Sequence, residues 1–268
     1  MKKRNSFLKN VLLVSIFVSF LISSCQLEPA PSNSKLAFQE FSTIVNQPLY
    51  NNQEFPAFEI KQQLLLPNDS AAFPVLYETM TKAFFEIQDV SNQSMMAHFQ
   101  EGTDFYVQQY KSIIKDMDRQ ASTESSSFNW MFDKTSRIVF QNEHYLSFEV
   151  RTYYYSGGAH GNTISSYYLI DLSTYKIISD KEFFKADNCA PIIGLQKQVL
   201  KKGDITMESF YDDGFKCDAN FYITEKGLVF HYNQYEINAY AVGPIDIVLD
   251  FTNINPYLLH PEKNGVSK

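Results

Sequence analysis

Residues 145–172 read YLSFEVRTYYYSGGAHGNTISSYYLIDL, and this stretch decides the fold. From Tyr145 to Tyr155 the side chains alternate in character with a period of two, the spacing of a β-strand with two different faces. Residues 163–172 form a second strand-like run after a glycine-rich connection. The stretch therefore predicts a hairpin of two long strands joined by a longer loop.

The first strand of this hairpin has one largely aliphatic face and one polar, aromatic face. The aliphatic face comprises Leu146, Phe148, Val150, Thr152 and Tyr154, and the other comprises Ser147, Glu149, Arg151, Tyr153 and Tyr155. If the tyrosines of the second face are exposed, they suit the binding of carbohydrate or protein, because a tyrosine ring combines an apolar body with a polar end. If they pack against helices or another strand, they are structural. The pattern alone leaves both interpretations open.

The loop between the two strands is either a tight connection or a site. It contains Ser156, Gly157, Gly158, Ala159, His160 and Gly161. These glycines join strand to strand, whereas phosphate-binding loops join a strand to a helix. Four residues along a hairpin tip do not by themselves bring the hydroxyl of Ser156 and the imidazole of His160 together. We therefore expect the glycines to supply positive φ angles, and His160 to hydrogen-bond across the tip.

The rest of the chain places helices before the hairpin and more strands after it. Helices are predicted at 74–88 and 94–119, with a break at Gly102, and at 192–200; strands are predicted at 55–66, 136–140, 176–178, 220–224, 228–232 and 245–251, and Asp180 is expected to cap the turn at 181–184. No β–α–β alternation is visible. We therefore expect an α+β fold of antiparallel β-sheet hairpins with helices packed on one face, in which a helix-rich N-terminal module precedes a strand-rich module.

The N-terminus has the features of a secretory signal. Basic residues at 2–4 precede an apolar run from Val11 to Ile22, which is too short to span a bilayer, and small residues lead to Cys25. Residues 22–25 resemble a bacterial lipobox, so we expect a signal peptide at 1–24 and a lipidated Cys25 followed by a flexible tether to residue 36. The expected location is the bacterial cell envelope, facing the periplasm or the cell surface. Ordinary secretion with an incidental cysteine is the alternative.

The net charge limits the kinds of molecule that the protein is expected to bind, and the cysteine content bears on a disulfide. The full chain has a net charge of −7, and removal of residues 1–24 takes away only cations and leaves −11. This balance argues against nucleic acid and leaves a cationic partner open. Outside the cytoplasm Cys189 and Cys217 are free to form a disulfide, but two unpaired thiols fit the sequence equally well.

Local motifs for catalysis or metal binding are missing. The histidines are His98, His144, His160, His231 and His260, and the closest pair is sixteen residues apart. The sequence contains no HExxH motif, no G-x-S-x-G elbow and no phosphate loop. We therefore expect no cofactor, no metal and no enzymatic activity.

Two blocks of the sequence resemble the RsiV/PdaC-type extracytoplasmic domain family. Residues 147–184 (SFEVRTYYYSGGAHGNTISSYYLIDLSTYKIISDKEFF) are similar to its first conserved block, and residues 220–251 are similar to its closing block. Residues 55–69 and the helix that follows are similar to the companion N-terminal module. The most specific positions are Gly157, Gly158, Ala159 and His160 together with Tyr235, Glu236, Gly243 and Pro244. The resemblance places a PdaC-like module at 37–125 and an RsiV-like module at 126–268.

The resemblance implies an α+β fold, an extracytoplasmic location and binding rather than catalysis. One branch of the family consists of anti-sigma factors that bind lysozyme, and another places the domain beside a peptidoglycan deacetylase. We expect neither a transmembrane helix nor a deacetylase module here, and Thr174-Tyr175 stands where the family has a Thr-Gly turn.

The function expected from these observations is that of a lipid-anchored envelope binding protein. Its ligand would be a lysozyme-like cationic protein or a cell-wall glycan such as a peptidoglycan fragment, and its lipid would hold it at the membrane. The alternatives are an envelope hydrolase with a site near Gly157–Gly161, and a structural assembly subunit.

Overall fold

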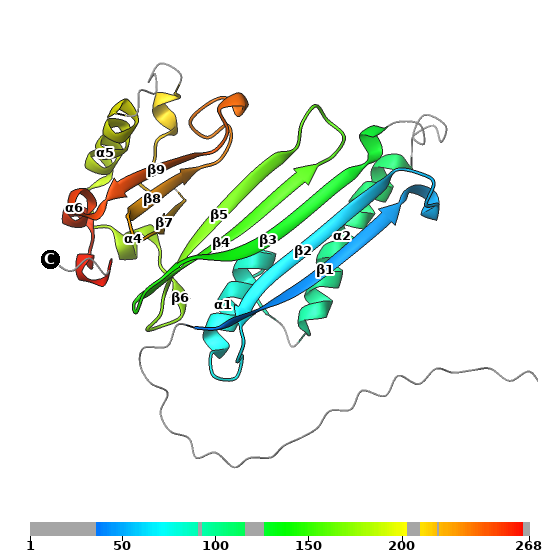
Figure 1. Cartoon of the computed structure of the whole chain (residues 1–268), viewed down its shortest axis with the longest axis horizontal. Helices are drawn as coiled ribbons and strands as arrows, with labels where there is room; N and C mark the ends of the chain where they lie inside the picture. The colour runs from blue at the N-terminus through cyan, green and yellow to red at the C-terminus, as the bar shows by residue number, and fades with distance from the viewer. Residues whose placement is uncertain (1–35, 91–92, 116–125, 203–209, 219, 265–268) are drawn as a thin grey trace, which may run out of the picture. The chain divides into compact units, whose positions relative to one another are not determined.

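Two β-sheets form the framework of the protein, as the computed structural model shows (Figure 1). The structure describes residues 36–90, 93–115, 126–202, 210–218 and 220–264. The six-stranded sheet has the order β1 (Phe38–Pro48), β2 (Ala57–Pro67), β3 (Trp130–Gln141), β4 (Tyr145–Tyr155), β5 (Asn162–Asp171), β6 (Lys176–Ile177). The three-stranded sheet has the order β7 (Phe221–Ile223), β8 (Gly227–Tyr232), β9 (Ile245–Asp250).

Some predictions lie outside these residues. The predicted signal peptide and Cys25 are among them, and they stay predictions, as does the boundary between the two modules at residue 125. Within the ranges that the structure describes, no helix is long and apolar enough to cross a membrane.

Two helices cover one face of the six-stranded sheet (Figure 1). Helix α1 (Pro74–Phe85) begins with a proline, which fits the first turn because that position needs no N–H donor. Helix α2 (Met95–Ile114) is capped by Ser94, whose side chain accepts a hydrogen bond from the Ala97 N–H. The face beneath them carries the buried apolar residues of β2 and β4, among them Leu64 and Phe148. The predicted α+β fold with helices on one face is confirmed.

The predicted break at Gly102 is wrong, because α2 runs through it. A Cβ at Gly102 would lie 3.3 Å from Oε1 of Gln62, a residue of β2. Gln62 is buried and donates from its amide to the Phe99 carbonyl and the Thr103 hydroxyl. The glycine therefore allows the helix to approach the strand closely.

The sheet contains a parallel pair that the sequence did not predict. Strand β2 pairs with β3 in parallel, with Phe58 opposite Trp130, while the other strand pairs given for the described residues are antiparallel. The connection between these two strands contains α1 and α2, so the first part of the chain does form a β–α–β crossover. Strand β1, also not predicted, pairs with β2 along its whole length.

Strand β4 is buried on both faces in its first half only. Residues 145–150 of β4 are all buried, whereas 151–155 are exposed or half-buried. The register of β3 shifts between Ile138 and Phe140, so that Phe140 packs against the apolar core of the three-stranded sheet, which includes Phe230, instead of against the helices. The polar, aromatic face is thus covered near Tyr145 and open near Tyr155.

The buried half of this face of β4 is covered by the three-stranded sheet. Packed with that sheet are α5 (Cys189–Lys202) and the short helices α4 (Asp180–Phe183) and α6 (Phe251–Ile254). Cys189 and Cys217 form a disulfide, the pairing that the sequence left open. The cap of α4 is Ser179 and not the predicted Asp180, because Ser179 and Glu182 form a reciprocal capping box.

Side-chain amides occupy the outer edge of β5 where no strand pairs with it. The N–H of Tyr167 donates to Asn220, and that of Ser165 donates to Asn233, both at 2.7 Å. Both amide groups donate back to the carbonyl of Ser165, at 2.6 Å from Asn220 and 3.2 Å from Asn233. The N–H of Thr163 donates to Gln234 at 3.4 Å. These amides take the place of a neighbouring strand and join the two sheets.

Replacing Asn220 with alanine tests this junction. Asn220→Ala leaves the Tyr167 N–H without its acceptor, so we expect the free energy of unfolding to fall by about 1–3 kcal/mol. Chemical denaturation measures the change. Asn46→Ala is the matched control, because Asn46 is exposed on β1, and it should change stability by less than about 0.5 kcal/mol. Equal stability of the two variants would contradict the assigned role.

Candidate functional site

The hairpin tip and the loop after β8 meet in the structure. The ring of His160 stacks on Tyr240 with 3.7 Å between ring centroids, and Tyr240 donates its hydroxyl hydrogen to the Gly161 carbonyl at 2.7 Å. Tyr235 lies 5.4 Å from Tyr240, also ring to ring. The positions singled out in the two blocks of sequence, around His160 and around Tyr235, therefore come together.

Only part of the prediction for the tip agrees with the geometry. Gly157 has φ of +84°, and a Cβ there would lie 1.9 Å from the Ser127 carbonyl oxygen. Gly158 does not have a positive φ and has open space around it. A Cβ at Gly161 would lie 2.3 Å from the hydroxyl of Tyr153. Gly157 thus allows a left-handed backbone conformation, and Gly161 allows the ring of Tyr153 to lie close to the backbone of the tip.

His160 and Ser156 do not form a catalytic pair in this geometry. Nδ1 of His160 lies 3.2 Å from the carbonyl oxygen of the adjacent Gly161, and the main contact of the ring is with Tyr240. The hydroxyl of Ser156 interacts with Tyr154. The expected hydrogen bond of His160 is therefore local, and stacking holds the ring against the neighbouring loop.

The remaining signature positions shape that loop. Glu236 accepts a hydrogen bond from the Asn233 N–H at 2.8 Å, which closes the turn after β8. Tyr235 and Gly243 both have positive φ, of 71° and 81°. Pro244 directly precedes β9 and, with Gln234, reaches the face of the six-stranded sheet. The loop is thus held in a defined shape beside β5.

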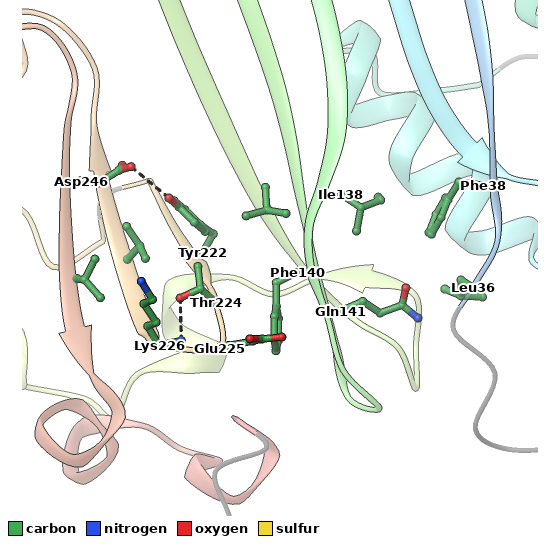
Figure 2. A pocket seen from close by; sticks show the side chains of 13 residues that line it. Leu36, Phe38, Ile138, Phe140, Gln141, Tyr222, Thr224, Glu225, Lys226 and Asp246 are labelled. Carbon is green, nitrogen blue, oxygen red and sulfur yellow. Dashed lines mark hydrogen bonds between the residues drawn. The ribbon is translucent and has the colours of Figure 1, made fainter.

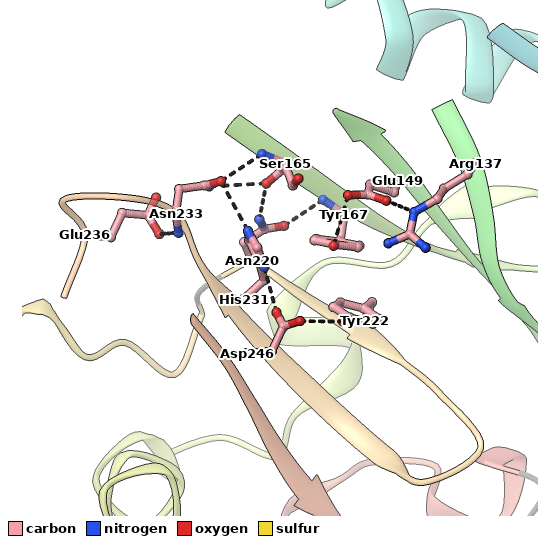
Figure 3. A network of polar contacts seen from close by, with 10 residues as sticks. All are labelled: Arg137, Glu149, Ser165, Tyr167, Asn220, Tyr222, His231, Asn233, Glu236 and Asp246. Carbon is pink, nitrogen blue, oxygen red and sulfur yellow. Dashed lines mark hydrogen bonds and ion pairs between the residues drawn. The ribbon is translucent and has the colours of Figure 1, made fainter. Parts of the chain in front are cut away.

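A buried polar network lies beneath this loop (Figure 3). Glu149 is 2% exposed and pairs with Nε of Arg137, while its other oxygen accepts from the hydroxyl of Tyr167 at 3.0 Å. The ring of Tyr167 stacks on Tyr222 at 4.1 Å. Tyr222 in turn donates to Asp246 at 3.3 Å. Both oxygens of the buried carboxylate therefore have donors, as a buried charge requires.

His231 extends this network into the second sheet. Its Nδ1 lies 2.7 Å from Oδ1 of Asp246, and its Nε2 lies 3.2 Å from Oδ1 of Asn233. Because Asn233 also binds the backbone of Ser165, the histidine is linked to the edge of β5. The side chain is buried and both ring nitrogens have partners, so His231 acts as a structural link between strands.

A pocket of about 540 Å³ opens between the sheet and the loop. It is lined by Thr135, Arg137, Glu149, Arg151, Thr163, Ser165, Gln234 and Pro244. Its volume falls in the range of about 300–1,000 Å³ that is common for small-molecule sites. The side chains that line it are polar, with two guanidinium groups on neighbouring strands. This pocket, here called the arginine pocket, is the candidate binding site.

A second, larger pocket of about 660 Å³ lies at the other end of the interface between the sheets (Figure 2). Apolar side chains such as Phe38, Ile138, Phe140 and Val248 line much of it. Its polar rim includes Glu225 and Lys226, which belong to the β7–β8 turn. The arginine pocket is the candidate of the two because Gln234 and Pro244 of the loop after β8 form part of its wall and two guanidinium groups line it.

The sequence analysis correctly placed Arg151 on the polar, aromatic face of β4 but did not identify it as a site residue. The signal was present, since Arg151 belongs to the alternating polar face. Arg137, Gln234 and Thr163 carried no comparable signal, because the pairing of β3, β4 and β5 and the position of the loop bring them together. Across the parts of the chain that the structure describes, no group of histidine, cysteine or acidic residues is arranged to hold a metal ion.

Exchanging glycines for alanine tests the tip. In Gly157→Ala the new Cβ meets the Ser127 carbonyl and the backbone keeps a positive φ, so we expect a loss of stability of at least about 1 kcal/mol. Gly158→Ala is the matched control next to it and should leave stability almost unchanged. Thermal unfolding of both variants measures the difference. A similar loss in both would show that the tip does not depend on the conformation of Gly157.

The tyrosines of the network predict a dependence of stability on alkaline pH. Burial, with the negative charge of Asp246 adding to it, raises the pKa of Tyr222 from 10.0 to about 12. Burial and the charge of Glu149 also raise the pKa of Tyr167. Because the folded state holds these protons more tightly, the stabilisation is complete below pH 10 and is lost as pH rises toward about 12.

Tyr222→Phe should make this alkaline loss of stability smaller by about 1–3 kcal/mol, since it removes one of the groups that titrate differently in the two states. Denaturation at a series of pH values measures the slope for the wild type, for Tyr222→Phe and for a control with a replaced exposed tyrosine, Tyr211→Phe. Identical slopes in all three proteins would rule out the contribution assigned to Tyr222.

Two family models match separate parts of the chain. The family described as "Deacetylase PdaC" matches residues 70–163, and the family described as "Protein of unknown function (DUF3298)" matches residues 172–252. The second match contains the loop after β8, and the first contains the hairpin tip. No curated protein matches the chain.

Solved structures share the fold. A DUF3298 family member from Bacteroides fragilis NCTC 9343 has a TM-score of 0.75 at 20% identity, over 86% of this chain and 96% of that chain. A DUF3298 family protein from Pseudomonas aeruginosa PAO1 has a TM-score of 0.60 at 12% identity, over 86% of this chain and 98% of that chain. The resemblance to the RsiV/PdaC-type domain family is therefore confirmed: the chain is similar to the PdaC model over residues 70–163 and to the DUF3298 model over residues 172–252.

Proposed function

We propose that this protein is a lipid-anchored binding protein of the bacterial cell envelope, and that it binds a peptidoglycan fragment on the open half of the six-stranded sheet. The observation that carries the proposal is the arginine pocket at the end of that open face. The lipid anchor rests on the lipobox-like residues that end at Cys25. The choice of ligand rests on the chemistry of the face.

The open face suits a glycan because it combines rings, hydroxyls and rigid backbone. Tyr153 and Tyr155 follow Arg151 on the same face of β4, and Tyr155 lies about 13 Å along the strand from Arg151. Met131 of β3 is 40% exposed and pairs with Tyr155 in the sheet. Apolar sugar faces pack on such side chains, while the hydroxyls of Thr135, Thr163 and Ser165 offer hydrogen bonds.

A lysozyme-like cationic protein is the second candidate ligand. Its support is the net charge of −11 outside the predicted signal peptide, which favours encounter with a basic partner. This support is long-range and does not point to a particular surface. The arginine pocket, in contrast, has a local excess of positive charge and favours the glycan.

An envelope hydrolase at the hairpin tip has less support than a binding protein. The ring of His160 is stacked on Tyr240, and its Nδ1 faces a carbonyl oxygen instead of a carboxylate. A general base needs a free nitrogen within reach of the reacting proton and an orienting partner. Among the described residues, the contacts of the exposed His160 ring are with the Gly161 carbonyl and Tyr240, and neither is the nucleophile or carboxylate that a hydrolase would place beside its base.

Calorimetric titration of residues 26–268 with muropeptides, chitotriose and lysozyme tests the proposal. We expect muropeptides to bind and Tyr155→Ala to weaken them about two- to tenfold, because the loss of ring packing costs about 0.5–1.5 kcal/mol. Tyr211→Ala, which removes an exposed tyrosine elsewhere, is the matched control. Binding of lysozyme without any binding of glycan would favour the second candidate, and no binding to any of these ligands would refute the proposed function.

A further inference from the structure

The charges that line the arginine pocket do not cancel. Glu149 is the acidic residue among the lining side chains, and both its oxygens have donors, Arg137 on one side and Tyr167 on the other. This buried carboxylate neutralises Arg137 and fixes it against β4. Arg151, on the same strand and the same face, has no ion pair or side-chain hydrogen bond within the part of the chain that the structure describes. Among the residues that line the pocket, one positive charge is therefore without an acidic partner.

The two residues directly opposite Arg151 in the sheet are neutral. Thr135 lies opposite it on β3, and Ser165 lies opposite it on β5. Both residues line the pocket and carry hydroxyl groups. A ligand oxygen that meets the guanidinium of Arg151 therefore has neutral donors directly beside it, and the nearest acidic residue on this face of β3, Asp133, lies two residues away along the strand, opposite Tyr153.

Gln234 adds a further donor at the wall of the pocket. Its Oε1 accepts the N–H of Thr163, so the carbonyl end of the side chain is held at the edge of β5. The NH₂ end of the same amide remains for a ligand, because no partner for it is found among the described residues. The pocket therefore presents one cation and several neutral donors, and its one acidic group already has its hydrogen bonds.

We infer that the arginine pocket binds a carboxylate group of the ligand, with the guanidinium of Arg151 as the charged partner and the Gln234 amide and the Ser165 hydroxyl as neutral donors. This inference rests on the proposed function and names the chemical class that the site selects. A single carboxylate balances the one positive charge that lacks an acidic partner in the pocket, and a planar carboxylate matches the two parallel N–H groups of a guanidinium. A dianionic phosphate would leave negative charge near the buried Glu149.

N-Acetylmuramic acid and N-acetylglucosamine form a matched pair of probes, because they share the sugar ring and differ by a lactyl group that carries a carboxylate. We expect the wild-type protein (residues 26–268) to bind the acidic sugar at least about tenfold more tightly than the neutral one, since a charged hydrogen bond contributes about 1.5–3 kcal/mol. Raising the salt concentration should reduce the difference. Titration followed by NMR chemical shifts suits weak binding.

Variants of Arg151 assign the effect to this side chain. Arg151→Gln should remove the preference for the acidic sugar, and Arg151→Lys should keep part of it, because lysine retains the charge without the planar fork. Lys201→Gln, which removes an exposed cation on α5, is the control and should keep the full preference. Arg151 is exposed, so Arg151→Gln should unfold at nearly the same temperature as the wild type.

The outcomes separate this inference from the proposed function. Equal affinity for the two sugars, or an unchanged preference in Arg151→Gln, overturns the carboxylate site while leaving glycan binding in place. If neither sugar, nor muropeptides, nor chitotriose binds, the proposed function fails as well. A preference that is lost only together with thermal stability in Arg151→Gln would also contradict the inference, because Arg151 would then act in folding.

Discussion

The free edge of β5 is the constraint on which the rest of this structure depends. A strand edge presents N–H and C=O groups that must be hydrogen-bonded when they are covered. Here the amides of Asn220, Asn233 and Gln234 satisfy the groups of residues 163–167, at distances of 2.6–3.4 Å. Because these amides come from the segments that flank β7 and β8, the same bonds that close the edge also attach the second sheet. The position of the pocket follows from this attachment.

The attachment divides one face of the β4–β5 hairpin into two environments. Where the second sheet covers it, polar side chains must find partners inside the protein. The hydroxyl of Ser147 does so by bonding both the N–H and the carbonyl of Ile223, and Glu149 does so through Arg137 and Tyr167. Two residues further along, Arg151 lies beyond the cover. Strand β4 therefore begins as a buried support and ends on the open face of the sheet, where it lines the arginine pocket.

The fold was predictable where a single local pattern decides it and not where contacts between distant segments decide it. The bounds of β4 follow from the strict alternation of residues 145–155, and α1 follows from its helical spacing. Strand β1 was missed because its apolar residues at 38, 41, 44 and 45 do not alternate, and pairing with β2 holds it. The parallel pair of β2 and β3 has no local signature.

The candidate site shows the same division. The sequence drew attention to Gly157, His160 and Tyr235 through their resemblance to a family, but the unpaired charge of the pocket comes from Arg151, which no motif marked. The two sets of residues have different tasks. His160 and Gly161 hold Tyr240, and Glu236 closes the turn from which Gln234 reaches the pocket.

The signature residues therefore position the wall of the pocket, while residues on β3 and β4 give it its charge. A resemblance carried by positioning residues indicates the fold and the place of the candidate site. The chemistry of the ligand has to be argued from the side chains that line the pocket, because the backbone that holds them would accommodate other side chains at the same positions.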